Sequence, residues 1–262
     1  MSTIRFERRE GIGSIVLANP PLNRIDSRYS SSLREAVHAA SESDIRVLVV
    51  RAEGPNFSLG GEVREWPGKD VNWFRTFVAE VNASYRVVEA LRVPTVAVVR
   101  GLAFGGGFEL ALSCDFLVAS ENAVFRCVEV TTGMLPIAGA LQRLAERVGR
   151  ARASRYSMLG EAILGKQAAE LGIATHVVPD AQVDAEADTL ARRLAAGPTR
   201  SYMATRTLLK AWSGGGITAA DAVMPDVTME LFHTQDVQRG FIHTAKAFDD
   251  NVEPSEMTFE GK

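Results

Sequence analysis

The chain has 262 residues, which is enough for one large domain or for a main domain with a small appendage, without need of disulfides or metal. Hydrophobic residues make up 46% and charged residues 23%, a balance that excludes a disordered chain, a collagen or a coiled coil. The 29 Lys and Arg against 32 Asp and Glu leave a formal charge of −3, which argues against general attraction to nucleic acid or anionic membranes.

The two cysteines and the N-terminal segment indicate in which cellular compartment the protein is expected. Cys114 and Cys127 stand in apolar surroundings, which predicts buried free thiols. No Cys or His pair has the spacing of a zinc site, so we expect no metal. The N-terminus is charged and has no apolar core of a secretory signal, and no apolar run approaches the ~20 residues needed to span a bilayer. We therefore expect a cytoplasmic protein.

The first part of the chain alternates strand patterns, loops and helical patterns. Apolar alternation predicts short strands, Pro and Gly clusters predict loops, and apolar residues every three to four positions predict helices. The predicted elements are strands at 4–6, 13–17 and 47–50, loops at 19–23 and 53–61, and helices at 26–41 (capped by Asp26 or Ser27) and 71–91.

The same alternation then recurs and gives way to helices alone. We predict strands at 96–99 and 116–119, a glycine-rich loop at 101–107, helices at 108–113, 142–148 and 151–159, and three terminal helices at 201–212, 219–232 and 236–248. Gly214 to Gly216 is the predicted hinge between the first two of these three. The pattern indicates layered α/β architecture, with an α/β core at 1–197 and a C-terminal helical region at 198–262.

The strongest local feature is the glycine-rich stretch 100–110 (RGLAFGGGFEL), which lies between a predicted strand and a predicted helix. Free N–H groups at such a turn can bind an anion or an oxyanion, and the spacing is not that of a dinucleotide-binding fingerprint. A tight structural turn is the other interpretation. A second small-residue loop, 58–61, could supply another N–H donor, since an oxyanion hole can draw its two donors from separate loops.

Two acidic residues follow in otherwise apolar runs. Glu109 lies in FELAL and Glu129 in FRCVEV, 20 residues further along. Carboxylates with apolar neighbours are expected to be paired or functional, and two of them can divide the donor and acceptor roles of acid–base catalysis. Solvated or salt-bridged surface acids are the alternative that the residues alone leave open.

These stretches resemble the enoyl-CoA hydratase/isomerase (crotonase) superfamily. Residues 57–63 (FSLGGEV) are similar to the family's F-x-x-G-A-D-[IL] segment, and residues 94–115 follow its central signature closely. The resemblance runs from about residue 4 to about residue 250. Further matching segments stand in the family's order at 119–125, 133–136, 142–144, 172–173 and 177–179.

The resemblance implies a spiral core of repeated ββα units and a helical C-terminal region that builds trimers and often hexamers. It implies an acyl-CoA thioester substrate with no metal or redox cofactor. The family's two oxyanion-hole amides fall on Gly61 and Gly106. Its two catalytic glutamates fall on Glu109, the base on the water side, and Glu129, the proton donor to Cα. The predicted acyl-CoA-binding residues are Gly61, Glu62, Val63, Arg64, Gly106 and Ile137.

Some positions depart from the family's pattern. Gly61 stands where Ala is usual, which keeps the amide but loosens the loop. Residues 135–141 (LPIAGAL) replace a P-G-A-G-G run, so that Ile137 and Ala140 are expected to put side chains on the pocket floor near Glu129 and to disturb a backbone contact to the water. The altered run, together with residues 53–60, also resembles hydratases that act on cyclic dienoyl-CoA.

Three functions follow as hypotheses. The first is a hydratase that adds water to a 2-enoyl-CoA or cyclic dienoyl-CoA. The second is a Δ3-Δ2 enoyl-CoA isomerase, for which Glu129 alone could shuttle the proton. The third is a non-catalytic acyl-CoA-binding subunit, suggested by the altered 135–141 segment. Retention of both glutamates favours the hydratase, while the acyl chain, the stereochemistry and the choice of trimer or hexamer stay open.

Overall fold

A computed structural model describes residues 3–261. Its main sheet has six strands in the order β1-β2-β3-β4-β6-β9, in which β1 and β2 are antiparallel and the other neighbours are parallel. A smaller sheet has the order β5-β7-β8. The strands are β1 Ile4–Arg9, β2 Ile12–Leu17, β3 Val47–Ala52, β4 Thr95–Val99, β5 Leu102–Phe104, β6 Phe116–Ser120, β7 Val124–Arg126, β8 Ile163–Leu164 and β9 His176–Val178.

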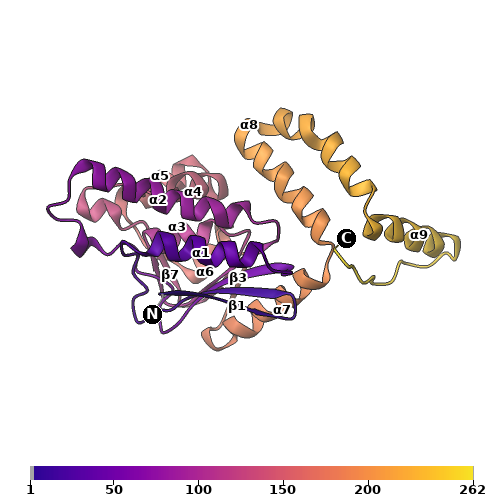
Figure 1. The fold of residues 1–262 in the computed structure, drawn as a ribbon, viewed down its shortest axis with the longest axis horizontal. Helices are drawn as coiled ribbons and strands as arrows, with labels where there is room; N and C mark the ends of the chain where they lie inside the picture. Colours follow the sequence, from indigo (N-terminus) through magenta and orange to yellow (C-terminus); the bar gives the residue numbers. More distant parts are fainter. Residues whose placement is uncertain (1–2, 262) are drawn as a thin grey trace.

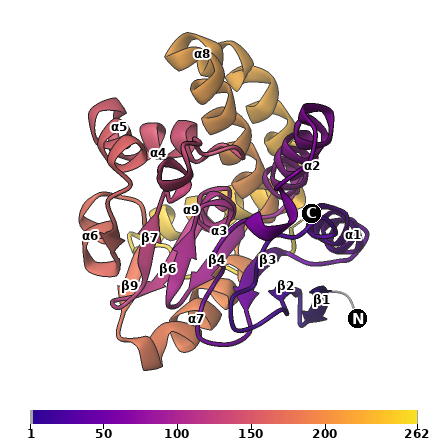
Figure 2. The same ribbon diagram turned by 90° about the vertical axis from the view of Figure 1, so that its left-hand side faces the viewer.

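Helices cover both faces of the main sheet (Figure 2). The central strands β3 and β4 are continuous Val-rich sequences, because both faces of each strand are buried. The helices are α1 Tyr29–Ser41, α2 Val71–Ala90, α3 Gly106–Leu112, α4 Ala140–Val148, α5 Arg150–Leu159, α6 Gly165–Glu170, α7 Val183–Ala196, α8 Thr199–Phe232 and α9 Gln235–Asp249, with 3₁₀ turns η1 Val63–Glu65, η2 Glu129–Thr132 and η3 Asp180–Gln182.

Two hydrophobic cores lie on opposite sides of this sheet. The larger core joins helices α1 to α5 to one face, for example through Leu33, Tyr85 and Leu144. The smaller core packs α7 on the other face, where Leu190 and Leu194 meet the outward valines of β3, β4 and β6. The sequence interpretation missed α7, although it has apolar residues at helical spacing. Cys114 and Cys127 are buried and free, as predicted.

The last two helices form an arm that extends away from the core (Figure 1). None of the residues of α8 is buried, and the helix breaks at Gly215 and Gly216, whose backbone angles are not helical. The predicted hinge is therefore confirmed. Arg206 ties the base of the arm to the core, since its guanidinium donates to Asp115 at 2.9 Å and to the carbonyl of Val93 at 2.7 Å. In the described part of the chain, no helix has the length and apolar character required to cross a membrane.

Several local predictions need correction. The first helix starts at Tyr29 after Arg28, without a side-chain cap, because Asp26 accepts a hydrogen bond from the N–H of Arg28 instead. The expected loop at 101–107 contains strand β5, and α3 starts at Gly106, two residues earlier than expected. Strand β5 escaped the sequence interpretation because three residues between glycines carry too little periodicity to mark a strand.

Candidate active site

Two glycine-containing segments are held side by side at the edge of the core. Ser58 and Ala103 form an isolated parallel bridge, in which the N–H of Ser58 donates to Leu102 at 3.1 Å and its carbonyl accepts from Phe104 at 2.9 Å. Each segment continues past this bridge into a predicted oxyanion donor, Gly61 in one and Gly106 in the other. The bridge therefore explains how residues 45 positions apart reach one site.

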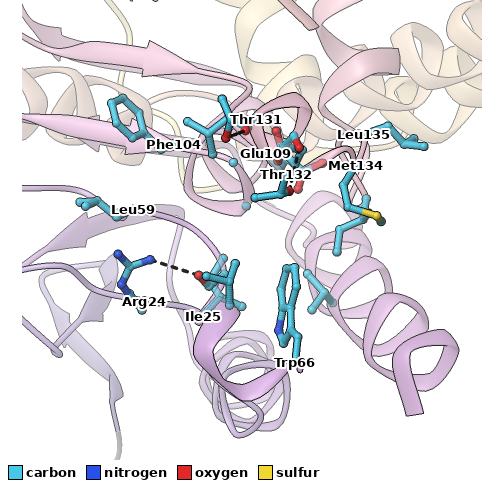
Figure 3. Close-up of a pocket in the computed structure, with 18 of the residues that line it drawn as sticks. Arg24, Ile25, Leu59, Trp66, Phe104, Glu109, Thr131, Thr132, Met134 and Leu135 are labelled. Atoms are coloured by element: carbon cyan, nitrogen blue, oxygen red, sulfur yellow. Dashed lines mark hydrogen bonds between the residues drawn. The ribbon is translucent and has the colours of Figure 1, made fainter. Parts of the chain in front are cut away.

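A cavity of about 270 Å³ opens beside these segments (Figure 3). Gly61 and Gly106 line it, together with both candidate glutamates, Glu109 and Glu129. Among the described residues, no acceptor pairs with the N–H of Gly61 or Gly106. Two unpaired backbone donors beside two carboxyl groups form a site that can stabilise negative charge on a bound oxygen and move a proton nearby.

Backbone contacts fix both donor peptides. The Ile25 N–H donates to the carbonyl of Gly60 at 3.0 Å, and the Glu62 N–H donates to the carbonyl of Ile25 at 2.9 Å. The first bond holds the peptide that carries the Gly61 N–H, and the second holds the peptide that follows it. On the other segment, the N–H of Glu109 donates at 3.0 Å to the carbonyl of Gly105, in the peptide that carries the Gly106 N–H. The buried Tyr85 hydroxyl donates to the carbonyl of the next peptide, at Gly106, at 2.8 Å. The donors are thus preorganised, which an oxyanion site requires.

Glu109 is held by the segment that departs most from the family's pattern. Its Oε1 accepts the N–H of Ala138 at 2.7 Å and the N–H of Ala140 at 3.0 Å, while its Oε2 is buried without a protein partner. Burial raises the pKa of Glu109, whereas the two N–H donors and Arg143 lower it in part. The carboxylate is therefore anchored at one oxygen and free at the other.

Glu129 begins η2, on the chain segment that follows β7. Its Oε2 is also buried without a partner. Burial, with the nearby charge of Glu109, raises the pKa of Glu129 to about 7. A carboxyl group with this pKa exchanges a proton readily at neutral pH, which suits a general acid or base. The charge of Glu109 thus acts on the titration of Glu129, as expected where two carboxyl groups share one cavity.

The remaining predicted residues divide into two groups. Val63 and Ile137 line the cavity, whereas Glu62 and Arg64 do not. The Arg64 Nε donates to Glu62 Oε1 at 2.7 Å, and Arg64 holds the pKa of Glu62 low, at about 2. Arg64 is 80% exposed and Glu62 14%.

The expectation for Ala140 is wrong. Ala140 is the first residue of α4, is buried and does not line the cavity, because its side chain packs into the larger core. The 135–141 segment instead binds Glu109 through its backbone, since the N–H groups of Ala138 and Ala140 donate to the carboxylate.

Trp66 and Arg24 are among the lining residues that the sequence interpretation missed. Trp66 stacks edge-on against Phe77, with ring centroids 5.7 Å apart, and forms an aromatic wall of the cavity. Arg24 also lines the cavity, and its Nη1 donates to the carbonyl of Gly61 at 3.2 Å. Arg24 is the one lining residue, among those described, that carries a positive charge.

The cavity has two chemically different ends. Arg24 and Leu59 lie together on one side in Figure 3, whereas Trp66, Met134 and Leu135 lie on the other. Glu109 lies between them in this view. An amphipathic ligand with an anionic end and an apolar end fits this polarity. Among residues 3–261, no three His, Cys, Asp or Glu side chains are arranged to hold a metal ion.

Comparisons with known proteins agree with this architecture. The profile of the enoyl-CoA hydratase/isomerase family matches residues 7–254. A protein named probable enoyl-CoA hydratase from Rhodobacter capsulatus is 28% identical over 239 residues, which cover 91% of this chain and 93% of that protein. The 2,3-dehydroadipyl-CoA hydratase of Escherichia coli is 33% identical over 185 residues, 68% of this chain and 70% of that enzyme.

The structure of enoyl-CoA hydratase subunit I from Geobacillus kaustophilus superimposes with a TM-score of 0.88 at 29% identity, covering 99% of this chain and 98% of that chain. The predicted fold class, a crotonase-like α/β core with a C-terminal helical region, is confirmed. The chain belongs to the enoyl-CoA hydratase/isomerase family.

Proposed function

We propose that this protein is an enoyl-CoA hydratase that adds water across the double bond of a 2-enoyl-CoA thioester whose acyl group is uncharged and apolar. The observation that carries the proposal is the convergence of four groups on one cavity. Two are N–H donors without an acceptor, at Gly61 and Gly106, and two are buried carboxyl oxygens without a partner, on Glu109 and Glu129.

The proposed reaction follows from these groups. A water held by the two Oε2 atoms attacks Cβ, and Glu109 accepts a proton from it. The π electrons of the double bond move toward the thioester carbonyl, whose oxygen becomes an enolate oxyanion bound by the two N–H donors, each worth roughly 3 kcal/mol. The enolate then collapses and Cα takes a proton from Glu129. Glu109 then passes the proton that it accepted to Glu129, through the next bound water, which restores both carboxyl groups. Each addition therefore consumes one water and requires no metal or redox cofactor.

The division of roles rests on the electrostatics of each glutamate. Burial raises the pKa of Glu109, but the two N–H donors and Arg143 oppose that rise and stabilise its charged form, which suits the base. Glu129 has a pKa of about 7, so about half of it is protonated at neutral pH, which suits the donor. A Δ3-Δ2 isomerase would need one carboxyl group alone, and the second anchored carboxylate favours hydration instead.

The two ends of the cavity indicate the substrate. The guanidinium of Arg24 can attract the phosphates of CoA, and the wall of Trp66, Phe77 and Ile137 suits an apolar acyl group. The apolar end, beside Trp66, has no cation among its described residues to pair with a carboxylate at the terminus of an acyl group. We therefore infer that a dicarboxylic acyl group, such as the name of the E. coli relative contains, is disfavoured.

The arm carries exposed apolar side chains that a lone chain would leave in water. We infer that it packs against further copies to form a trimer or a dimer of trimers, because exposed apolar patches of this kind mark association surfaces. Light scattering after size exclusion tests this. The side chains are those of Leu209, Trp212, Ile217, Met224, Met229, Phe232, Phe241, Ile242 and Phe248.

The decisive experiment is mass spectrometry of acyl-CoA thioesters incubated with the protein in deuterated water. The panel holds 2-enoyl, 3-enoyl, cyclic dienoyl and terminally carboxylated 2-enoyl members. Gain of one water by an apolar 2-enoyl or cyclic dienoyl member supports the proposal. Deuterium uptake with double-bond migration and no added water assigns the isomerase instead. Binding without any turnover assigns a non-catalytic acyl-CoA-binding subunit.

A further inference from the structure

One short segment connects Glu109 to an arginine on the opposite side of the backbone. Residues 138–140 present two N–H groups to Glu109 Oε1 and two carbonyls to the Nη1 of Arg143, at 3.2 Å for Ala138 and 3.1 Å for Gly139. Ala138 and Gly139 precede α4, and Ala140 is its first residue. Among the described residues, the only backbone hydrogen bond to the carbonyls of Ala138 and Gly139 is the one that Gly139 accepts from the N–H of Arg143 at 3.2 Å.

Arg143 is itself held firmly. Its Nε and Nη2 donate to the two carboxylate oxygens of Glu89 on α2, at 2.6 and 2.7 Å. This bidentate pair leaves Nη1 for the two carbonyls and fixes the plane of the guanidinium. The Arg143 side chain is 17% exposed and that of Glu89 is 32% exposed, so the pair is partly shielded from water.

The backbone is shaped to accept this guanidinium. Gly139 has φ of +101°, and a Cβ at this position would lie 1.9 Å from the Nη1 of Arg143. Only glycine therefore allows the arginine to reach both carbonyls. Asn82 on α2 adds a further hydrogen bond to the segment, at the carbonyl of Ile137.

We propose that Arg143 is a positioning residue for Glu109, which it orders by clamping the 138–140 segment whose N–H groups hold the carboxylate. The inference rests on the proposed function for its kinetic consequence, but the geometry it asserts does not depend on the substrate. Arg143 touches neither substrate nor reacting atoms. It keeps Glu109 Oε1 engaged and thereby leaves Oε2 directed into the cavity.

Arg143→Lys tests the proposal, because lysine keeps the charge but cannot pair with Glu89 in a bidentate manner and reach two carbonyls. Arg147→Lys is the matched control. Arg147 lies one turn further along α4 and also donates to carbonyls, those of Ile173, Leu112 and Cys114, none of which belongs to the 138–140 segment. Glu89→Gln loosens the same clamp without touching the arginine.

The first readout is kinetic, on the 2-enoyl-CoA that the wild type hydrates. We expect Arg143→Lys to lower kcat about tenfold or more with KM within about threefold, and Glu89→Gln to lower kcat less. We expect Arg147→Lys to stay within about twofold of the wild type. Equal kcat values for the two lysine variants, or a loss confined to KM, overturn the proposal.

The second readout needs no substrate and separates this inference from the proposed function. Carboxyl-¹³C glutamate labelling and NMR titration give the pKa of Glu109, with Glu109→Gln identifying its signal. Arg143 is the charged side chain that acts on the pKa of Glu109, and Glu109 in turn acts on the titration of Glu129, Tyr85 and Cys127. We expect Arg143→Lys to raise this pKa by about one pH unit as the N–H donors disengage, and Arg147→Lys to leave it unchanged.

If no thioester is hydrated but the pKa moves in Arg143→Lys alone, the proposed function fails and the positioning role stands. If the pKa moves in neither lysine variant, or equally in both, the positioning role is overturned whatever the activity. Thermal unfolding of each variant shows that the comparison is made between folded proteins.

Discussion

The indole ring of Trp66 occupies the space that a side chain at position 61 would need, so glycine at this position and the indole depend on each other. A Cβ on Gly61 would lie 2.7 Å from Cζ2 and 3.0 Å from Cη2 of the indole, against an ordinary contact of 3.4 Å or more. In Gly61→Ala, the ring must withdraw by roughly 0.7 Å, and overpacking of this kind costs ~1–3 kcal/mol. The loss of backbone entropy in the unfolded chain offsets ~0.4–1 kcal/mol of that cost.

A double-mutant cycle isolates this contact. Trp66→Phe removes the two indole carbons that the new methyl group would strike. Gly61→Ala is therefore expected to lower the free energy of unfolding by ~0.5–2 kcal/mol in the wild type and to leave it unchanged or raise it in the Trp66→Phe protein. Urea unfolding of the four proteins measures the coupling without any substrate. An equal penalty in both backgrounds would refute the reasoning, since the indole would then not be what requires glycine.

Three further predictions concern the carboxyl groups. Glu109→Gln and Glu129→Gln should each lower the rate of hydration by at least about a hundredfold while largely keeping the affinity for acyl-CoA. Steady-state kinetics measures the rate and calorimetry measures the affinity. If both variants remain active, the assignment of the two carboxyl groups is contradicted. The raised pKa of Glu129 means that the folded protein holds a proton that the unfolded chain releases from about pH 4.5. The stability due to protonated Glu129 is thus fully present below pH 4.5 and is lost as the pH rises through about 7. The difference in unfolding free energy between the wild type and Glu129→Gln should therefore vary with pH between these two values. A difference that stays constant with pH argues against the raised pKa. Asp236 accepts the N–H groups of Glu260 and Gly261 at 2.9 and 2.7 Å, so Asp236→Ala should speed proteolytic trimming of the C-terminus, and an unchanged trimming rate would show that the tail is held elsewhere.

Much of the candidate site could be predicted from the chain because its chemistry depends on residue types in continuous motifs. The glycine-rich turn before α3, the acidic residues in apolar runs and the alternation of strands with helices are all local patterns. Local patterns also predicted the break of the terminal helices at Gly215 and Gly216. Their physical basis, backbone freedom and side-chain periodicity, acts over a few residues and can be read without knowledge of the fold.

Other features needed the tertiary structure because they join residues that are distant in sequence. The sequence suggested that Ala140 would intrude on the pocket, whereas the fold turns its methyl group into the core and its N–H toward Glu109. The same holds for the clamp of Arg143 and Glu89, 54 positions apart, and for the indole of Trp66 against Gly61. Burial itself, which raises the pKa of Glu129, is a property of the packed molecule. The sequence by itself determined which groups were available for chemistry, and only the packing of distant segments decided which way each group faces and how it ionises.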